Sequence, residues 1–339
     1  MGMGAIWFEK QNFADHLHEI IGYKSGVAAS IEHMCDLLSG TGFDDKIIQS
    51  EHHGLRIRSE DYDALYYKLL HGVGVTERPL DGIFELFKVA REIERKKGLE
   101  FAKSIQEIYG RHMEIETKKA RQSGLKVWSP EKMIKETAKV HGAAGLDAIM
   151  LLIRAYDDLI KHSPRTSMRF HEYSNIINLS DLFQQHNPSV ASGDFLDQRF
   201  LDFLANNTGK LGEIHWRKFE ELTAECFKRF GYIVELGPGA NDDGVDMRVW
   251  DEAKEGTPKF IVQCKRTKSK IEKVTIKGLY ADVQHEGCEL GVLVTSSELS
   301  VGARATIEAR SYPVEEVNRG NIIKWLSVLR TPGTGIVRL

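Results

Sequence analysis

The chain has 339 residues, of which 42% are hydrophobic and 28% are charged, and its formal net charge is −3 at pH 7. These proportions are typical of a globular protein and exclude a disordered, fibrous or repetitive chain. The nearly neutral charge also excludes a general electrostatic attraction of the whole chain to nucleic acid. At this length we expect two domains rather than one core.

No apolar stretch approaches the length of a membrane span, and the first twenty residues lack the basic start and apolar core of a signal peptide. We therefore expect a cytoplasmic protein with no membrane partner. The four cysteines lie far apart and form no CxxC pair, so neither disulfides nor structural zinc are expected. Cys226 and Cys264 fall within apolar patterns and are predicted to pack as small hydrophobic residues.

Residues 1–192 are predicted to form a mostly α-helical domain. Apolar positions recur at helical spacing near residues 25–38, 59–70, 80–115, 131–139 and 142–161. Ser129 and Pro130 are predicted as the N-cap and first turn of the fourth of these helices. The buried stripe of the last helix is predicted at Leu146, Ile149, Ile153, Tyr156 and Ile160. No catalytic or metal-binding spacing occurs in this domain, so a sensor, an oligomerisation surface and a DNA contact all remain open roles.

A polar segment rich in helix breakers, residues 186–193 (HNPSVASG), predicts a boundary after this domain. A linking segment at 193–210 follows it, with a helix expected over 195–206 that ends near Thr208 and Gly209.

From residue 211 to 332 the pattern changes to mixed α/β. Helices are expected at 216–230, 273–286, 301–310 and 321–329, strands at 232–236, 245–250, 259–266 and 290–294, and an extended piece at 314–317. Gly231 is expected to end the first helix. The order predicts a small mixed sheet with helices on both faces.

Glu220, in the helix expected at 216–230, lies at the edge of its apolar stripe. A carboxylate pressed against a core needs a partner. Glu221 and Glu225 are expected opposite the stripe, where Glu225 can pair with Arg229 at i+4.

A glycine-rich segment at residues 237–246 (GPGANDDGVD) carries three acids. Asp242 and Asp243 are interpreted as ordinary turn residues. Asp246 instead stands at the start of an alternating strand, which fixes its direction and favours it as a metal ligand.

Residues 259–266 (KFIVQCKR) combine the pattern of a buried strand with two polar interruptions, Gln263 and Lys265. Residues two apart in a strand point to the same side, so these two share a face, while Val262 and Cys264 pack on the other. A buried lysine is costly unless its ammonium meets an anion. The alternative is an edge strand with one polar face.

Together these residues suggest one catalytic site. Asp246, the side-chain oxygen of Gln263 and a nearby carbonyl would hold a hard cation, with Glu220 contributing directly or through water. Oxygen ligands that retain water suit Mg²⁺, for which Mn²⁺ can substitute. Such a cation activates water and neutralises charge on a phosphate, and Lys265 would orient or help deprotonate that water. In-line attack would leave a 5′-phosphate and a 3′-hydroxyl.

Six basic residues and one acid, Glu272, lie within residues 265–277. Such a run is ordinarily a solvated surface, but beside a catalytic site it is a candidate strip for DNA phosphates. Besides Lys265, its members are Arg266, Lys268, Lys270, Lys273 and Lys277. Because a phosphate-binding strip is not base-specific, RNA remains open as a substrate.

Five motifs occur in series at residues 216–220 (WRKFE), 231–232 (GY), 242–246 (DDGVD), 263–266 (QCKR) and 291–300 (GVLVTSSELS). In this order, and within residues 211–329, they resemble the Mrr-type restriction endonucleases of the PD-(D/E)xK nuclease superfamily. The resemblance implies an αβββαβ core, magnesium, and double-stranded DNA as substrate. It also implies that Asp246 and Gln263 bind metal, that Lys265 is the catalytic lysine and that Glu220 is the helix acid.

Two positions depart from the superfamily pattern. Gln263 replaces the second acid, as in the QxK variant that Mrr-type proteins share, so this change does not argue for an inactive site. Asp243 stands where the family often has a second glycine, which puts the approach of DNA at that turn in question. Residues 1–192 do not resemble the winged-helix domain that often precedes this nuclease.

The leading hypothesis is a metal-dependent DNA endonuclease that acts in defence against foreign DNA, and the defence role rests on the resemblance alone. Two alternatives stay open: a non-cleaving DNA-binding or sensor module on a nuclease fold, and a repair or junction-resolving nuclease. Since cutting both strands often takes two active sites, we expect a homo-oligomer. The helical domain is the expected place for its interface and for a partner protein or trigger.

Overall fold

The computed structural model describes residues 4–9, 12–50, 53–82, 84–123, 129–167, 173, 175–184, 194–239, 244–251 and 254–330. The linker predicted at 186–193 and the turn residues Asp242 and Asp243 lie outside these ranges. Within them, no helix is both long enough and apolar enough to cross a membrane.

Contacts between residues group the chain into two compact units. The first comprises Met1–Ile6, Ile57–Tyr67 and Leu80–Phe170, and the second comprises Trp7–Arg56, Lys68–Pro79 and His171–Leu339. The boundary predicted along the sequence at residues 192–193 stays a prediction.

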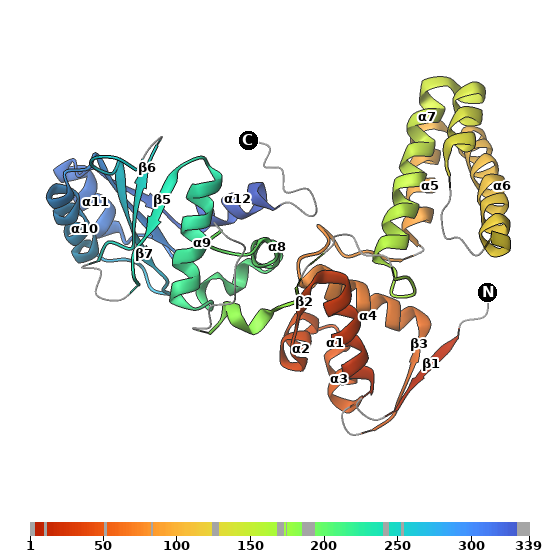
Figure 1. Cartoon of the computed structure of the whole chain (residues 1–339), viewed down its shortest axis with the longest axis horizontal. Coiled ribbons are helices and arrows are strands. Elements are labelled where there is room, and N and C mark those ends of the chain that lie inside the picture. Colours follow the sequence, from red (N-terminus) through yellow and green to blue (C-terminus); the bar gives the residue numbers. More distant parts are fainter. Residues whose placement is uncertain are drawn as a thin grey trace. The chain divides into compact units, whose positions relative to one another are not determined.

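The first unit contains a bundle of three long helices, α5 (Phe84–Lys97), α6 (Leu99–Ser123) and α7 (Glu131–His162). The three helices lie side by side (Figure 1). Their shared core contains Ile93, Ala102, Ile105, Ile108, Met133, Ala148, Ile149, Leu152 and Ile153. The single helix predicted at 80–115 is two helices, because Gly98 between them adopts a φ of +91° that ends α5.

The break predicted between residues 139 and 142 is present inside α7, where Gly142 leaves helical geometry with φ 59° and ψ −146°. Two details of this helix were predicted wrongly. Pro130, not Ser129, occupies the N-cap position, and it makes no side-chain capping bond. Leu146 is 38% exposed, whereas Ile149 and Ile153 are buried, so the stripe begins one turn later than the periodicity indicated.

Further helices and strands occur before residue 184. They are β1 (Ala5–Phe8), α1 (Asn12–Ser25), β2 (Val27–Ala28), α2 (Ile31–Leu38), α3 (Asp44–Ser50), β3 (Leu55–Arg58), α4 (Ser59–Gly72), β4 (Ile177–Asn178) and the 3-10 helix η1 (Leu179–Leu182). The prediction of a mostly helical N-terminal region is confirmed. The strands escaped prediction because segments of two to four residues show too little alternation to be recognised.

The C-terminal part begins with α8 (Gln198–Asn206), capped by Asp197, and the 3-10 helix η2 (Thr208–Gly212). The elements that follow are α9 (Trp216–Arg229), β5 (Ile233–Leu236), β6 (Met247–Trp250), β7 (Phe260–Lys265), α10 (Lys273–Glu286), β8 (Leu290–Thr295), α11 (Val301–Arg310), β9 (Val314–Val317) and α12 (Arg319–Leu329). The strands form one mixed sheet in the order β5-β6-β7-β8-β9, antiparallel from β5 to β7 and parallel from β7 to β9. Strand β7 is therefore central, and the alternative of an edge strand is wrong.

Helices cover both faces of this sheet (Figure 1). On one face, Ile261 of β7 and Leu293 of β8 pack with Ile276, Leu279 and Val283 of α10. On the other face, Phe227 of α9 contacts Phe260 of β7 and Trp325 of α12.

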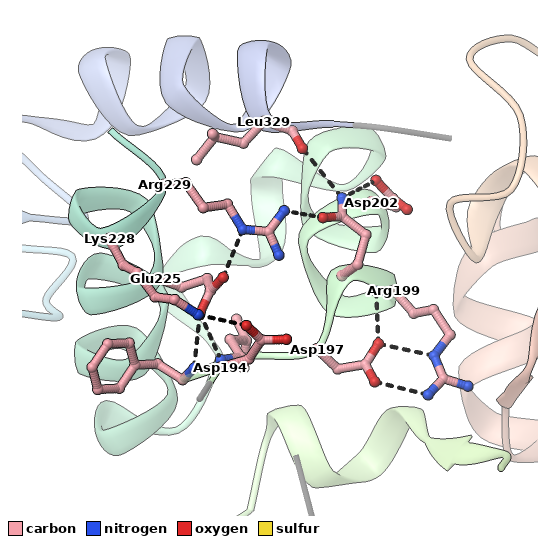
Figure 2. Close-up of polar contacts among 11 residues, drawn as sticks. Asp194, Asp197, Arg199, Asp202, Glu225, Lys228, Arg229 and Leu329 are labelled. Atoms are coloured by element: carbon pink, nitrogen blue, oxygen red, sulfur yellow. Dashed lines mark hydrogen bonds and ion pairs between the residues drawn. The ribbon is translucent and has the colours of Figure 1, made fainter. Parts of the chain in front are cut away.

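Helix α9 is buried on nearly all sides, which its sequence pattern did not indicate. Glu221 and Glu225 lie opposite the apolar stripe as predicted, yet their exposed fractions are 8% and 0%. Glu225 pairs with Arg229 at 2.6 Å as expected, and Lys218 pairs with Glu221 at 2.7 Å. The segment that leads into α8 covers this face, because the backbone N–H of Phe195 donates to Glu225 Oε2 (Figure 2).

Candidate active site

Asp246 and Gln263 become neighbours through the register of β6 and β7. Met247 is paired with Val262, and the backbone N–H of Asp246 also donates to Val262 O at 3.0 Å, so Asp246 lies against β7 one residue before Gln263. The side chain of Asp246 also accepts a hydrogen bond from the backbone N–H of Cys264 at 2.5 Å. Both side chains are buried; Gln263 lies within β7, and Asp246 directly precedes β6.

The side-chain amide of Gln263 leaves one buried oxygen without a partner. Its Nε2 donates to Gly244 O at 2.9 Å, while its Oε1 has no hydrogen-bond partner among the described residues. Because Gly244 offers a carbonyl acceptor, the nitrogen must face it and the oxygen must face away. Leaving a buried acceptor unsatisfied costs about 1–3 kcal/mol. A hard cation that takes oxygen ligands would satisfy this atom.

Gly244 itself requires glycine. Its φ is +92°, a conformation that L side chains rarely adopt, and a Cβ on it would lie 3.0 Å from Gln263 Nε2 and 3.8 Å from Asp282 Oδ2. The backbone therefore approaches the candidate site more closely than any side chain would allow.

Gly244→Ala is expected to lower DNA cleavage strongly, because the new methyl group would displace the Gln263 amide as well as strain the turn by about 1–3 kcal/mol. Gly256→Ala is the matched control, since Gly256 has a φ of +67° but nothing within 4 Å of its Cβ position. Thermal melting and cleavage rates of both variants measure the two effects. Equal cleavage by the two variants would contradict a role for the Gly244–Gln263 contact.

Glu220 is buried in the first half of α9 and has an arginine as its partner. Arg217 Nη1 lies 2.9 Å from Glu220 Oε2, one helical turn earlier. The Glu220 carboxylate was predicted to need a partner, and Arg217 is that partner. The sequence analysis had given Arg217 no role. The i,i+3 spacing of Arg217 and Glu220 is the signal that could have identified it.

The charges of three predicted site residues act on a single thiol, Cys264. Burial raises the pKa of this thiol, and the carboxylates of Asp246 and Glu220 raise it further, whereas the ammonium of Lys265 lowers it. Each of these three charges therefore lies near the Cys264 thiol. Cys264 itself is buried, as predicted, like Cys226.

Lys265 is the last residue of β7 and is half-buried. Its carbonyl accepts hydrogen bonds from Thr295 Oγ1 at 2.8 Å and from the backbone N–H of Ser296 at 3.3 Å. The end of β8 therefore holds the backbone from which the lysine side chain extends.

Within the described ranges, no three His, Cys, Asp or Glu side chains converge as a metal-binding group. The candidate set differs from such a group because one of its three members, Gln263, contributes an amide oxygen. The remaining members, Asp246 and Glu220, supply two carboxylates.

The predicted phosphate strip is exposed along its length, at Arg266, Lys268, Lys270, Lys273 and Lys277. Two members already have partners: Arg266 donates to Gly212 O at 3.0 Å, and Lys270 pairs with Glu298 at 2.7 Å.

His215, which caps α9, was not identified from the sequence. Its ring nitrogen accepts from the backbone N–H of Arg217 at 3.2 Å. Burial lowers the pKa of His215, and the charges of Arg266 and Lys218 lower it further, which favours the neutral ring that capping requires. The hydrogen bond from Arg266 to Gly212 O, three residues before His215, brings the end of β7 close to the start of α9.

Residues 211–326 match the restriction endonuclease family Mrr_cat, which confirms the resemblance predicted for the C-terminal domain. Among solved structures, the chain is similar to the MspJI restriction endonuclease in complex with a 27-mer oligonucleotide, with 20% sequence identity and a TM-score of 0.30. That similarity covers 57% of this chain and 43% of the MspJI chain, so the chain spans less than half the length of that protein. A search of the curated proteins finds no match.

Proposed function

We propose that this restriction endonuclease domain is a metal-dependent endonuclease that hydrolyses phosphodiester bonds of double-stranded DNA. The observation that carries the proposal is the buried Oε1 of Gln263, which has no hydrogen-bond partner among the described residues and lies one residue before Cys264, whose backbone N–H donates to the Asp246 carboxylate. A buried polar atom of this kind is ordinarily satisfied by an ordered water or a bound ion. We take the series from α9 to β8 as the αβββαβ core that presents this pair.

Asp246 and Gln263 would hold a Mg²⁺ ion, and Mn²⁺ could take its place. When bound, such an ion supplies Lewis-acid stabilisation of negative charge on the phosphate and activation of water. Glu220 joins this set directly or through a water molecule. Its contact with Arg217 holds the carboxylate in a fixed position, because an arginine–carboxylate hydrogen bond is short and directional.

Lys265 would act on the attacking water. Its position two residues after Gln263 places it on the same face of β7, where its ammonium orients the water, helps to remove its proton and balances the charge that develops on the phosphate. In-line attack by this water leaves a 5′-phosphate and a 3′-hydroxyl. The exposed strip from Arg266 to Lys277 would follow the DNA backbone by charge alone.

The biological setting follows from the family only. Defence against foreign DNA, a cytoplasmic location, a homo-oligomer that cuts both strands, and a partner protein or trigger that acts through the helical region are parts of the same proposal.

Purified protein is expected to cut double-stranded DNA in magnesium and to stop when the metal is chelated. Lys265→Ala should abolish cleavage, because no other described cation is placed on this face of β7. Lys259→Ala is the matched control: this exposed lysine precedes the same strand and pairs with Asp251 at its far end. Cleavage of supercoiled, linear and methylated DNA on gels measures the effect.

Two other outcomes would redirect the proposal. Protein that binds DNA but never cuts it, with magnesium or manganese present, would make the domain a binding or sensor module. Preferential cutting of branched over linear duplexes would instead identify a repair or junction-resolving nuclease.

A further inference from the structure

A polar pocket lies at the carboxyl ends of the three parallel strands. It has a volume of about 490 Å³, and its wall includes Thr267 and Lys268 after β7, Ser296 and Ser297 after β8, and Asn318 and Arg319 after β9. Glycines of η2 close the opposite side. In open α/β sheets, ligands bind outside the carboxyl ends of the strands, so this edge is the expected place for one.

The acids and the cations of this pocket differ in how they are paired. Glu213 pairs with Lys210 at 3.0 Å, and Glu298 pairs with Lys270 at 2.7 Å, so both negative charges are already balanced. Lys268 has no ion pair among the described residues.

Arg319 likewise has no ion pair among the residues that the structure describes. Its Nη2 donates to the carbonyl of Thr208 at 3.0 Å, which holds the side chain in place but leaves its charge unbalanced. The pocket therefore presents two uncompensated positive charges, from Lys268 and Arg319, beside the hydroxyl groups of Thr267, Ser296 and Ser297.

The start of α12 adds little to this charge. Asn318 and Asn321 form a reciprocal capping box there, so the helix satisfies its own first N–H groups. The preference of the pocket for an anion rests on the two side chains and not on the helix end.

The pocket shares the sheet edge with the candidate active site. Lys268 follows Lys265 by three residues, and neighbouring strands lie about 4.8 Å apart, so the pocket extends about 10 Å from β7 towards β9.

We propose that this pocket binds a backbone phosphate of the DNA outside the scissile bond, through Lys268 and Arg319. The proposal rests on the proposed endonuclease function, because the DNA is the substrate positioned by this contact. Arg319 extends the phosphate strip beyond the run that the sequence showed, since it comes from a distant part of the chain and joins Lys268 only in the folded sheet.

The test is the salt dependence of DNA binding by the full-length chain, measured by fluorescence anisotropy of a labelled duplex in EDTA. Lys268→Ala and Arg319→Ala should each reduce the slope of log K against log salt by about 1, and should each weaken binding by about five-fold near ~0.15 M salt. The double variant should lose about 2 from the slope.

Two controls separate charge from structure. Lys324→Ala removes an exposed lysine from the same helix, α12, and should leave both slope and affinity unchanged. Arg319→Lys keeps the charge and should retain the wild-type slope. An unchanged slope in the double variant overturns the proposal.

Inorganic phosphate distinguishes a free ligand from a DNA contact. If phosphate raises the melting temperature of the wild type but not of the double variant, while DNA binding is equal in both, the pocket holds a free anion and the proposal is wrong. If the wild type cuts DNA and the variants bind it normally, only the pocket assignment fails. If the variants lose salt slope but the wild type never cuts, the pocket stands and the nuclease function fails.

Discussion

Asp246→Asn is expected to lower the rate of DNA cleavage by about 10²–10³-fold or more, the scale on which removal of one electrostatic contact to the transition state acts. The substitution removes the negative charge that would attract a cation but keeps the size and one oxygen of the side chain. That oxygen can still accept the hydrogen bond from Cys264 N, so the local fold should persist. Single-turnover cleavage measures the rate, and calorimetric titration with Mg²⁺ measures the loss of metal affinity.

Asp251→Asn supplies the control for this prediction. Asp251 directly follows the same strand, β6, but is exposed and pairs with Lys259, so the variant removes the same charge away from the candidate site. Cleavage and metal binding should remain at wild-type values. If Asp246→Asn loses cleavage but binds Mg²⁺ as the wild type does, Asp246 is not the metal ligand and its role must be sought in positioning Gln263.

The sequence predicts the C-terminal elements well because local residues mark where several of them begin or end. Gly231 adopts a φ of +97° directly after α9, and Ser300 caps α11 through its side chain, so periodicity and breakers together locate the ends of these helices. The alternation in residues 259–266 also indicates correctly that Gln263 and Lys265 share one face of a strand.

The sequence cannot predict what distant segments add to these elements. Nothing in residues 259–266 shows that β7 is central. Its pairing with β6 and β8 depends on tertiary structure, which the local pattern does not contain. The contact between Gln263 and the carbonyl of Gly244 depends on a register across two strands. The joint position of Lys268 and Arg319 likewise depends on the parallel arrangement of β7 and β9.

The polar side of α9 was misjudged for the same reason. Its charged residues resemble a solvated surface, yet the segment that leads into α8 covers them. Glu225, fully buried, accepts hydrogen bonds from the backbone N–H groups of Phe195 at 2.8 Å and Leu196 at 3.5 Å, and from Arg229 Nε at 2.6 Å. Arg229 in turn donates to Gln198, which bonds the carbonyl of Leu329 at the end of α12 (Figure 2).

Glu225→Ala is therefore expected to destabilise the C-terminal part by about 3–5 kcal/mol, the cost of breaking a buried ion pair by removing one partner. Such a loss is a large fraction of the roughly 5–15 kcal/mol that stabilises an ordinary domain. Urea unfolding followed by tryptophan fluorescence and hydrogen exchange in α8 and α9 measures it. Glu308→Ala, an exposed glutamate on α11, is the control and should change stability by less than about 0.5 kcal/mol.

A double replacement separates the two roles of Glu225. Glu225→Leu with Arg229→Met removes both charges together, which ordinarily restores most of the energy that a single deletion loses. Here the recovery should be incomplete, because the N–H groups of Phe195 and Leu196 would still lack an acceptor, at about 1–3 kcal/mol for a buried donor. Full recovery would show that the ion pair alone matters. Partial recovery, together with faster exchange at Phe195, would show that Glu225 joins the linking segment to the nuclease domain.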